Sequence, residues 1–576
     1  MRRLATLVLS VACAAPAAAD GVRGPLDAAF LAGSGKLEAP VPLEAYARPP
    51  QAQAATVAFN GRLRFPVATG EAGFRLLVDS FGSAGGEDQS YQAPPPFDFH
   101  FVQVDDRLVP VERGARRSDH AWWEWIVAPG RVWHEPADGE WNRAALPFAW
   151  QERNANCTHN GVLTFLYRAD GQVTRVAYQV SQETCMYFKF DAWGTAAAAW
   201  APGEPAAAAQ VAAAYRRELA GRMETRPVAA LASDFPGIDP ANFGSPQDVT
   251  PGHMTVFGVV AGGRHYVGGC DTRAGPYPYC DEMLLPSYSL AKTVVAGFGL
   301  MRLELLHPDA RKAKVVDYVP ECRAAGGWDD VTFDHLLDMS TGHYDSSKRE
   351  EDENTSVTRP FFLVEDHATK IQIACTRYPR RERPGRTWVY HTSDTYILGT
   401  ALQAYWRARH GQDADFYRDL LVEPVFQRLG LGPEVAVTRR TRDEAAQPFS
   451  GWGLTLRRDD VAKLARFLAV DGGRVDGEAV LDPAQVDAAL HRSRNDRGLP
   501  AGSRDFRYNN GVWAWDAGPY LGCRGRAWIP FMSGFGGISV AMAPNGVVYY
   551  YVSDNNEYRW ARAIAESQKL GAVCRK

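Results

Sequence analysis

The sequence predicts an all-β, sandwich-like domain followed by a larger α/β (α+β) domain in which an antiparallel sheet contains a helical insertion. Three observations support this fold class. The chain has 576 residues, too many for one ordinary core, so two or more domains are expected. Residues 55–200 mostly alternate apolar and polar positions with a period of two, as half-buried strands do. Residues 245–576 have strand patterns at both ends and helical patterns between them.

The predicted strands begin after residues 20–54, which are rich in Ala and Pro and predict a leader or linker. In the 55–200 domain, Gly, Pro and Asp interrupt the strand-like runs GFRLLVDSF, FDFHFVQV, AWWEWIVA and VLTFLYRADGQVTRVAYQV, the last a hairpin turning at 169–172. Six of the sixteen tryptophans fall within residues 122–150. We expect them to fill a core or a domain interface; stacking on sugars, hence glycan or cell-wall contact, is the alternative.

Residues 201–244 predict a helical linker, because AAAAQVAAAYRRELAGRM is rich in alanine and other helix-favouring residues. The 245–576 domain begins with strands in MTVFGVVAGGRHYVGG and continues through helical patterns such as WDDVTFDHLLDMSTGH. It ends with a hairpin in GGISVAMAPNGVVYYYVSDN, turning at residues 544–546, and a helix from residue 557 to residue 570. This order predicts that the two ends of the domain meet in one sheet.

The first 19 residues, MRRLATLVLSVACAAPAAA, predict a secretory signal peptide with a basic start, an apolar stretch and a small-residue cleavage site. Lipoprotein processing at Cys13 is disfavoured, because Ser10 stands where leucine is expected. Removal of residues 1–19 leaves eight cysteines, an even number that can pair in an oxidising compartment. A periplasmic or secreted protein is therefore expected.

Proximity in sequence favours one cysteine pairing among the many that eight cysteines allow, namely Cys157–Cys185, Cys270–Cys280, Cys322–Cys375 and Cys523–Cys574. No C-x-x-C or H-E-x-x-H motif supports a metal site instead, and no cofactor is expected. The formal net charge is -4 and no basic block stands out, so nucleic acid is not an expected partner. No run beyond the signal approaches the ~18 apolar residues of a membrane span, so no transmembrane segment is expected.

Ser289 and Lys292, in LLPSYSLAKTVVAGFGL, are the first candidates for chemistry. Only ten of the 63 Lys and Arg residues are lysines, and Lys292 alone among them has a serine three residues before it. Arginine stays protonated, whereas a desolvated lysine can lose its proton and serve as a base. On a helix the two side chains share one face, and the free N–H groups of the helix start favour an oxyanion at Ser289. A capping serine and a surface lysine are the structural alternative.

The segment WVYHTSDTYILGTAL supplies a second candidate pair, Tyr390 and Thr392, just before an apolar helix. A tyrosinate held beside a lysinium is a workable general base, so Tyr390 is expected to share proton transfer with Lys292. A core tyrosine and a capping threonine are the alternatives.

The segment FMSGFGGISV supplies the third candidate group, Met532, Ser533 and Gly534, at the start of a strand. Its small residues would let a substrate lie against the backbone. The N–H group of Phe535 is expected to join that of Ser289 as a second oxyanion donor. An ordinary strand start is the alternative.

In order, Ser289-x-x-Lys292, Tyr390-x-Thr392 and Met532-Ser533-Gly534 resemble the three motifs of the penicillin-binding-protein and class C β-lactamase-like serine hydrolases. The resemblance covers roughly residues 245–576 and includes VTFDHLLDMSTGH and GWGLTLRRDDVAKLARFL. The helix start at residues 393–399 is most similar to the 6-aminohexanoate-dimer hydrolase and esterase branch. The resemblance implies a β-lactamase-like fold and cofactor-free hydrolysis through an acyl-enzyme.

Two positions depart from the family pattern. The third motif usually begins with Lys or His, a cation for a substrate carboxylate, but here it begins with Met532, which favours neutral esters or amides. Thr392 stands where Asn is common, and a shifted register with Ser393 in its place stays open. Tyr390 is preferred because only a phenol can serve as the base.

We therefore expect a secreted serine hydrolase that cleaves an ester or amide bond of a small-molecule or peptide-like substrate. Ser289 is the expected nucleophile, and Lys292 and Tyr390 are the expected proton-transfer groups. Within the enzyme class, the alternative is a D-Ala-D-Ala peptidase or a β-lactamase. From another class, the alternative is an envelope glycan-binding protein with a degenerate hydrolase domain.

Overall fold

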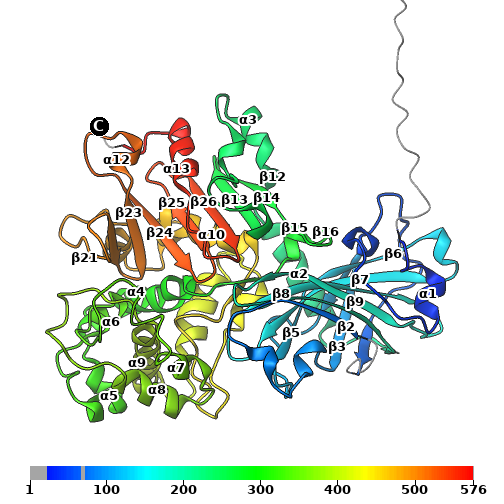
Figure 1. The fold of residues 1–576 in the computed structure, drawn as a ribbon, viewed down its shortest axis with the longest axis horizontal. Helices are drawn as coiled ribbons and strands as arrows, with labels where there is room; N and C mark the ends of the chain where they lie inside the picture. The colour runs from blue at the N-terminus through cyan, green and yellow to red at the C-terminus, as the bar shows by residue number, and fades with distance from the viewer. Residues whose placement is uncertain (1–22, 67–71, 575–576) are drawn as a thin grey trace, which may run out of the picture.

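The computed structural model describes residues 23–66 and 72–574 as two β-sheets that lie side by side, with helices packed mainly on the second (Figure 1). The predicted signal peptide at 1–19, including Cys13, lies outside the described residues. Among the described helices, none is long and apolar enough to cross a membrane.

The first sheet contains eleven antiparallel strands in the order β11-β1-β3-β4-β6-β7-β8-β9-β10-β2, with β5 paired to β7. The all-β N-terminal part is confirmed, and its strands form one continuous curled sheet (Figure 1). The register shifts between β8 and β9, where Ser181 has no partner, and between β10 and β2, where Leu77 has none, and such bulges increase twist and bend a sheet. The strands are β1 (Gly61–Phe65), β2 (Ala72–Asp79), β3 (Phe97–Val104), β4 (Arg107–Pro110), β5 (Trp123–Val127), β6 (Gly130–His134), β7 (Asn142–Glu152), β8 (Thr158–Tyr167), β9 (Val176–Thr184), β10 (Phe188–Ala196) and β11 (Ala199–Pro202).

Aromatic side chains fill the core inside this sheet. Four of the six tryptophans of residues 122–150 are fully buried: Trp123, Trp125 and Trp150 in this core, and Trp133 in the separate cluster that contains Leu26 and Tyr46. The core interpretation of this cluster is therefore confirmed for these four. The predicted hairpin is also present, since β8 and β9 pair directly.

Residues 23–54 pack against the protein, although their composition predicts a leader or linker. They form the helix α1 (Ala28–Ala32) and a 3-10 turn, Leu43–Tyr46. Leu26, Leu31 and Tyr46 are completely buried, in the same core cluster as residues of β7, β8 and β9. A few large apolar side chains within an Ala- and Pro-rich segment are enough to cover the outer face of these strands.

The helix α2 (Ala208–Gly221) follows β11 and packs on β3 and β4. The second sheet begins soon after it, inside the segment predicted as a helical linker, because β12 (Thr225–Pro227) pairs in parallel with β14. The rest of this nine-stranded sheet is antiparallel, in the order β12-β14-β13-β26-β25-β24-β23-β22-β21. Its strands are β13 (Met254–Ala261), β14 (Arg264–Gly269), β21 (Leu499–Pro500), β22 (Phe506–Asn509), β23 (Val512–Asp516), β24 (Trp528–Gly534), β25 (Ile538–Met542) and β26 (Val548–Ser553).

The pairing of β13 with β26 confirms that the two ends of the 245–576 region meet in one sheet. Alternate residues of β26 enter different cores: Val548, Tyr550 and Val552 face the helical core, whereas Tyr549 and Tyr551 face the opposite side. The predicted terminal hairpin is formed by β25 and β26.

The helices between and around these strands are α3 (Leu231–Asp234), α4 (Phe298–Leu306), α5 (Pro320–Ala325), α6 (Phe333–Leu337), α7 (Arg359–Leu363), α8 (His367–Thr376), α9 (Thr392–His410), α10 (Arg458–Ala469), α11 (Pro483–Ala489), α12 (Gly518–Leu521) and α13 (Ala561–Ser567). Two π-helical turns, Lys292–Gly297 and Tyr417–Phe426, accompany them. Short strand pairs join β15 (Asp271–Thr272) with β16 (Gly275–Pro276), β17 (Leu285–Pro286) with β18 (Thr455–Leu456), and β19 (Arg474–Val475) with β20 (Glu478–Ala479). All four predicted disulfides are present.

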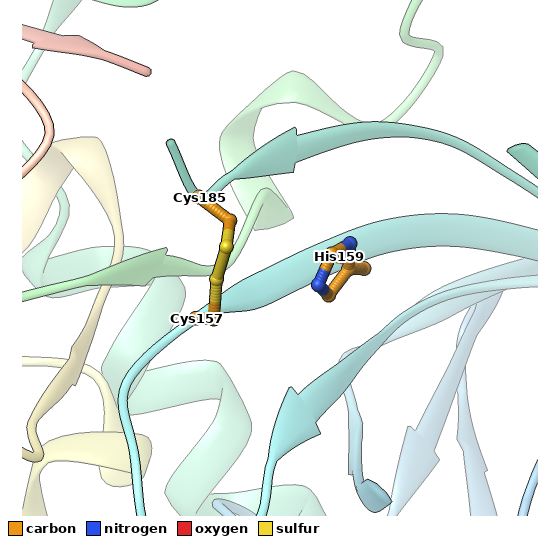
Figure 2. A group of neighbouring side chains, drawn as sticks. All are labelled: Cys157, His159 and Cys185. Carbon is orange, nitrogen blue, oxygen red and sulfur yellow. A yellow bond between two sulfur atoms is a disulfide. The ribbon is translucent and has the colours of Figure 1, made fainter. Parts of the chain in front are cut away.

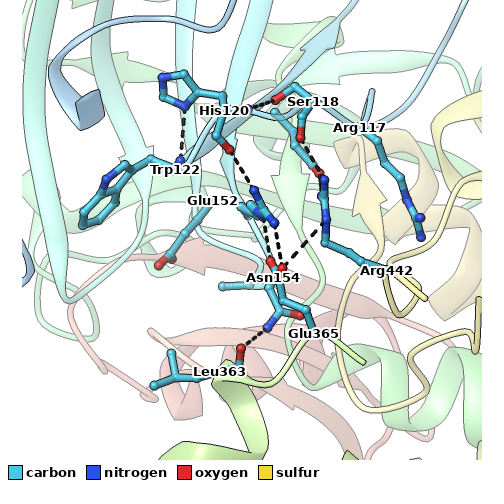
Figure 3. A network of polar contacts seen from close by, with 12 residues as sticks. Arg117, Ser118, His120, Trp122, Glu152, Asn154, Leu363, Glu365 and Arg442 are labelled. Carbon is cyan, nitrogen blue, oxygen red and sulfur yellow. Dashed lines mark hydrogen bonds and ion pairs between the residues drawn. The ribbon is translucent and has the colours of Figure 1, made fainter. Parts of the chain in front are cut away.

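Charged and amide side chains join the first sheet to the helical region. Glu365, just after α7, accepts two hydrogen bonds from Arg153 at 2.6 and 2.7 Å. Asn154 donates to the Leu363 carbonyl at 2.8 Å, and Arg442 donates to the Ser118 carbonyl at 2.8 Å (Figure 3). These contacts fix the position of α7 against the loop that connects β7 and β8.

Candidate active site

Ser289 lies at the start of a helix that follows the short strand β17. The N–H groups of Leu290 and Ala291 donate to the carbonyls of Ser287 and Tyr288 at 3.0 and 3.1 Å, so helical bonding begins at this turn. The helix continues through the π-helical turn Lys292–Gly297 into α4. Wide turns of this type are frequent at functional sites. Ser289 itself is half-buried and lines a cavity.

Lys292 is 2% exposed, and its ammonium group has three hydrogen-bond acceptors. Nζ donates to Ser289 Oγ at 2.8 Å, to Thr392 Oγ1 at 2.8 Å and to the Gly451 carbonyl at 3.3 Å. Burial lowers the pKa of Lys292 to about 8, against the opposing effect of two nearby glutamates. A useful fraction of this lysine is therefore neutral near pH 7, and its nitrogen already contacts the serine hydroxyl.

Tyr390 lies beside the same ammonium group, with Lys292 Nζ 4.8 Å from the centre of its ring. Burial raises the pKa of Tyr390 well above its usual value, and a hydrogen bond with Ser289 only partly opposes this rise. The phenol therefore stays protonated near neutral pH, so Lys292 is the one of the two that is partly available as a proton acceptor, and Tyr390 holds a proton that it can pass on.

Thr392 is the first residue of α9 and connects Lys292 to a carboxylate. Its hydroxyl accepts from Lys292 and donates to Glu353 Oε1, while its N–H donates to Glu353 Oε2 at 3.0 Å. Glu353 lines the cavity from the segment between α6 and α7. Sequence reasoning missed it, because the only signal is its place in the acidic run EEDE, which a solvated loop would also contain.

The neighbouring His391 has a structural role. Its Nε2 is 3.1 Å from Asp352 Oδ2, and its ring stacks on Tyr378 with 3.9 Å between ring centres. Burial lowers the pKa of His391, but the hydrogen bond to Asp352 and the nearby carboxylate of Asp394 outweigh it and raise that pKa to about 9. The resulting ion pair fixes the segment that contains Glu353 to the start of α9.

The third motif ends β24 and lies against the turn that contains Ser289. A Cβ atom on Gly534 would lie 3.0 Å from the Ser287 carbonyl oxygen, so a larger residue would push the two segments apart by a few tenths of an ångström. Ser533 and Phe535 line the cavity. Within the described residues, no acceptor is found for the N–H groups of Ser289 and Phe535. Both are available to a ligand.

Met532, expected beside the substrate, has a different surrounding. It is 2% exposed and belongs to the core cluster that contains Leu290, Ala291 and Val294. Neighbouring side chains of a strand point to opposite faces, so Met532 of β24 points into the helical core while the next residue, Ser533, lines the cavity. Met532 therefore supports the helix behind Ser289.

The cavity has a volume of about 1410 Å³ and lies between the two parts of the molecule. This exceeds the ~300–1,000 Å³ of most small-molecule pockets. The region after residue 245 contributes an aromatic wall, and the first sheet and its loops contribute the opposite side. The wall includes Phe506, Trp513, Trp515, Phe531 and Trp560; the opposite side includes Phe81, Glu152, Arg153, Met186 and Tyr187.

A group with the composition of a metal site lies where β8 begins and β9 ends. Cys157, His159 and Cys185 form the one such group found among the described residues. Figure 2 shows the two sulfur atoms joined in a disulfide, so neither is a thiolate ligand. The His159 ring is completely buried and stacks on Phe190 with 4.3 Å between ring centres. This group is a covalent link with a packed histidine beside it.

Comparison with known proteins assigns the second part of the chain to a family. The family model described as Beta-lactamase matches residues 250–562, more than half of the chain, and no curated protein matches. Among solved structures, a putative 6-aminohexanoate-dimer hydrolase from Bacillus anthracis is 16% identical, with 57% of this chain and 80% of that chain covered and a TM-score of 0.41. EstCE1, a hydrolase with promiscuous acyltransferase activity, is 15% identical, with 62% and 98% covered and a TM-score of 0.42. A class C beta-lactamase is 12% identical, with 62% and 96% covered and a TM-score of 0.38. The match over residues 250–562 shows that the chain belongs to the beta-lactamase family and is a serine hydrolase of that fold.

Proposed function

We propose that the protein hydrolyses an ester or amide bond through an acyl-enzyme formed on Ser289. The part-buried contact between Lys292 Nζ and Ser289 Oγ, 2.8 Å long, is the observation that supports this most directly. A serine hydroxyl is a weak nucleophile until a neighbour removes its proton, and a lysine with a lowered pKa can do so.

In the proposed acylation step, neutral Lys292 takes the proton of Ser289 as Oγ bonds to the substrate carbonyl carbon. The negative charge that develops on the carbonyl oxygen is bound by the N–H groups of Ser289 and Phe535. As the tetrahedral intermediate collapses, Tyr390 donates its proton to the leaving oxygen or nitrogen and receives one from Lys292. Water then attacks the acyl group, and the same groups transfer its protons in the reverse order.

The proposed substrates are small-molecule or peptide-like esters or amides without a required carboxylate. The third motif supplies no cation, because Met532 replaces the Lys or His usual in β-lactamases. Five arginines line the cavity, none of them in the third motif: Arg153, Arg349, Arg359, Arg559 and Arg562. Arg153 is paired with Glu365, and Arg349 lies over the faces of Phe506 and Trp513, 4.9 and 5.1 Å from the ring centres. The aromatic wall favours an apolar acyl or leaving group.

The proposed location is the periplasm or the exterior of the cell. Four disulfides support an oxidising compartment, and the predicted signal peptide at residues 1–19 agrees with it.

Intact-mass analysis after treatment with a fluorophosphonate tests the proposal. Wild type should gain one adduct, and Ser289→Ala and Lys292→Ala should gain none. Ser233→Ala, which removes an exposed serine outside the cavity, should label like wild type. No adduct on folded wild type would overturn the proposal and favour a binding protein with a degenerate hydrolase domain.

Hydrolysis of a chromogenic cephalosporin separates the proposed substrates from those of the alternative within the enzyme class. We expect it to be slow compared with hydrolysis of a p-nitrophenyl ester. Faster turnover of the cephalosporin would favour a β-lactamase or a D-Ala-D-Ala peptidase.

A further inference from the structure

Asn156, in the loop that connects β7 and β8 of the first sheet, contacts the turn that contains Ser289. It is 1% exposed. Its Oδ1 accepts from the Tyr288 N–H at 2.8 Å, the Gly453 N–H at 3.1 Å and the Ser287 hydroxyl at 3.2 Å. Its Nδ2 donates to the Leu454 carbonyl at 3.2 Å. One side chain thus joins residues 287–288 to residues 453–454, the two segments that meet behind the nucleophile.

The residue that Asn156 contacts most closely has a strained backbone. Tyr288 has a φ of 40°, in the left-handed region that a bulky side chain rarely adopts. Strain of this kind persists only where surrounding contacts enforce it. The peptide plane that follows Tyr288 carries the N–H group of Ser289. Relaxation of Tyr288 to a negative φ would therefore redirect that N–H group and the Ser289 side chain.

The loop with Asn156 is itself firmly held. The disulfide Cys157–Cys185 anchors the next residue to the end of β9. Asn154 donates to carbonyls of residues 362–364, and the Arg153–Glu365 ion pair lies beside it. These constraints let a single amide oppose backbone strain in another part of the chain.

We propose that the N-terminal β domain is a working part of the active site, with Asn156 as a positioning residue that holds the strained turn at residues 287–289. Held in this conformation, residues 287–289 direct Ser289 Oγ toward Lys292 and the Ser289 N–H toward the substrate oxygen. This inference rests on the proposed role of Ser289 as nucleophile.

The test measures how the rate of fluorophosphonate adduct formation saturates with probe concentration, in the full-length chain. Asn156→Ala should lower the maximal rate on the order of 10- to 100-fold, because misplacement of a nucleophile or of one oxyanion donor has effects of this size. Asn156 lines the cavity but is only 1% exposed, so the half-saturating probe concentration should stay within about twofold. Asn156→Asp keeps an acceptor for the Tyr288 N–H and should restore most of the rate.

Asn160→Ala is the matched control. Asn160 is also 1% exposed and also joins the two parts, through two hydrogen bonds to the backbone of Leu284, but it does not contact residues 287–289. Its loss should leave the maximal rate within about twofold of wild type. Thermal unfolding of each variant shows that it is folded. If Asn156→Ala does not fold, Asn156→Ser replaces it, because serine is too short to reach the Tyr288 N–H, the Gly453 N–H and the Ser287 hydroxyl together. The same fall in maximal rate is then expected.

The outcomes separate the two proposals. If wild type forms no adduct, both the nucleophile and its positioning residue are refuted. If wild type is labelled and Asn156→Ala reaches the rate of Asn160→Ala, the role of Ser289 stands and the role of Asn156 is refuted. A change in half-saturating concentration with an unchanged maximal rate would also refute it, because it would place Asn156 in binding alone.

Discussion

The acylation rate of Ser289 should rise with pH and level off near pH 9, because the buried Lys292 must be neutral to accept the serine proton. With a pKa of about 8, the neutral fraction of Lys292 is roughly 9% at pH 7 and roughly 91% at pH 9, a tenfold gain. An unshifted lysine, with a pKa of 10.5, would be only about 0.03% neutral at pH 7. Its rate would still be climbing tenfold per unit at pH 9.

The assay follows adduct formation with a fluorophosphonate by intact mass from pH 6 to pH 10. Lys292→Arg keeps a positive charge that does not titrate in this range, so it should show no adduct at any pH. A flat profile between pH 6 and pH 9 would refute the assignment of Lys292 as base. A rate that still climbs tenfold per pH unit at pH 10 would point instead to a base of higher pKa, such as the Tyr390 phenolate, whose pKa burial raises well above its usual value.

Four further predictions concern electrostatics and stability. The Glu353 carboxylate raises the pKa of Lys292, so Glu353→Gln should shift the midpoint of the acylation profile to lower pH. Between pH 8 and 10.5, Lys292 keeps its proton in the unfolded chain but has lost it in the folded chain. The stability of wild type relative to Lys292→Met, measured by urea unfolding, should therefore rise by about 1.4 kcal/mol per pH unit in that window. A constant difference would contradict this prediction. Replacing Cys322 and Cys375 together by serine opens a loop with a sequence separation of 53 and should cost about 4 kcal/mol of unfolding free energy. Arg457→Met leaves the buried carboxylates of Glu218, Glu282 and Glu434 short of a cation and should cost about 3–5 kcal/mol, whereas a loss below 1 kcal/mol would show that the network adds little.

Periodicity predicted the strands because it reports local burial. FDFHFVQV corresponds to β3, and the run around residues 544–546 becomes the β25–β26 hairpin. Composition did not predict that residues 23–54 pack against the protein. A few leucines and a tyrosine among Ala and Pro are enough to bury the segment against strands that are distant in sequence. Bulges in β9 and β2 help the first sheet to curl, and the sequence has no clear marker for them.

The candidate site was predictable where its residues follow a local spacing. Ser289 and Lys292 share a helix, so their contact follows from a three-residue interval. Tyr390 and Thr392 could be placed beside them only through resemblance to a family. Glu353 and Asn156 have no motif, because their positions depend on loops whose course is set by contacts such as His391 with Asp352 and the Cys157–Cys185 disulfide.

The family match covers residues 250–562, but the cavity is also lined by residues outside that range. Tyr187 and Glu152 of the first sheet line it, and Tyr187 contacts Phe535, with 6.2 Å between ring centres, at the proposed oxyanion donor. Under the proposed function, substrates therefore meet a surface that lies outside the residues of the family match. Substrate preference should follow the loops of the first sheet, and changes there should alter which ester is cleaved while Ser289 and Lys292 retain their chemistry.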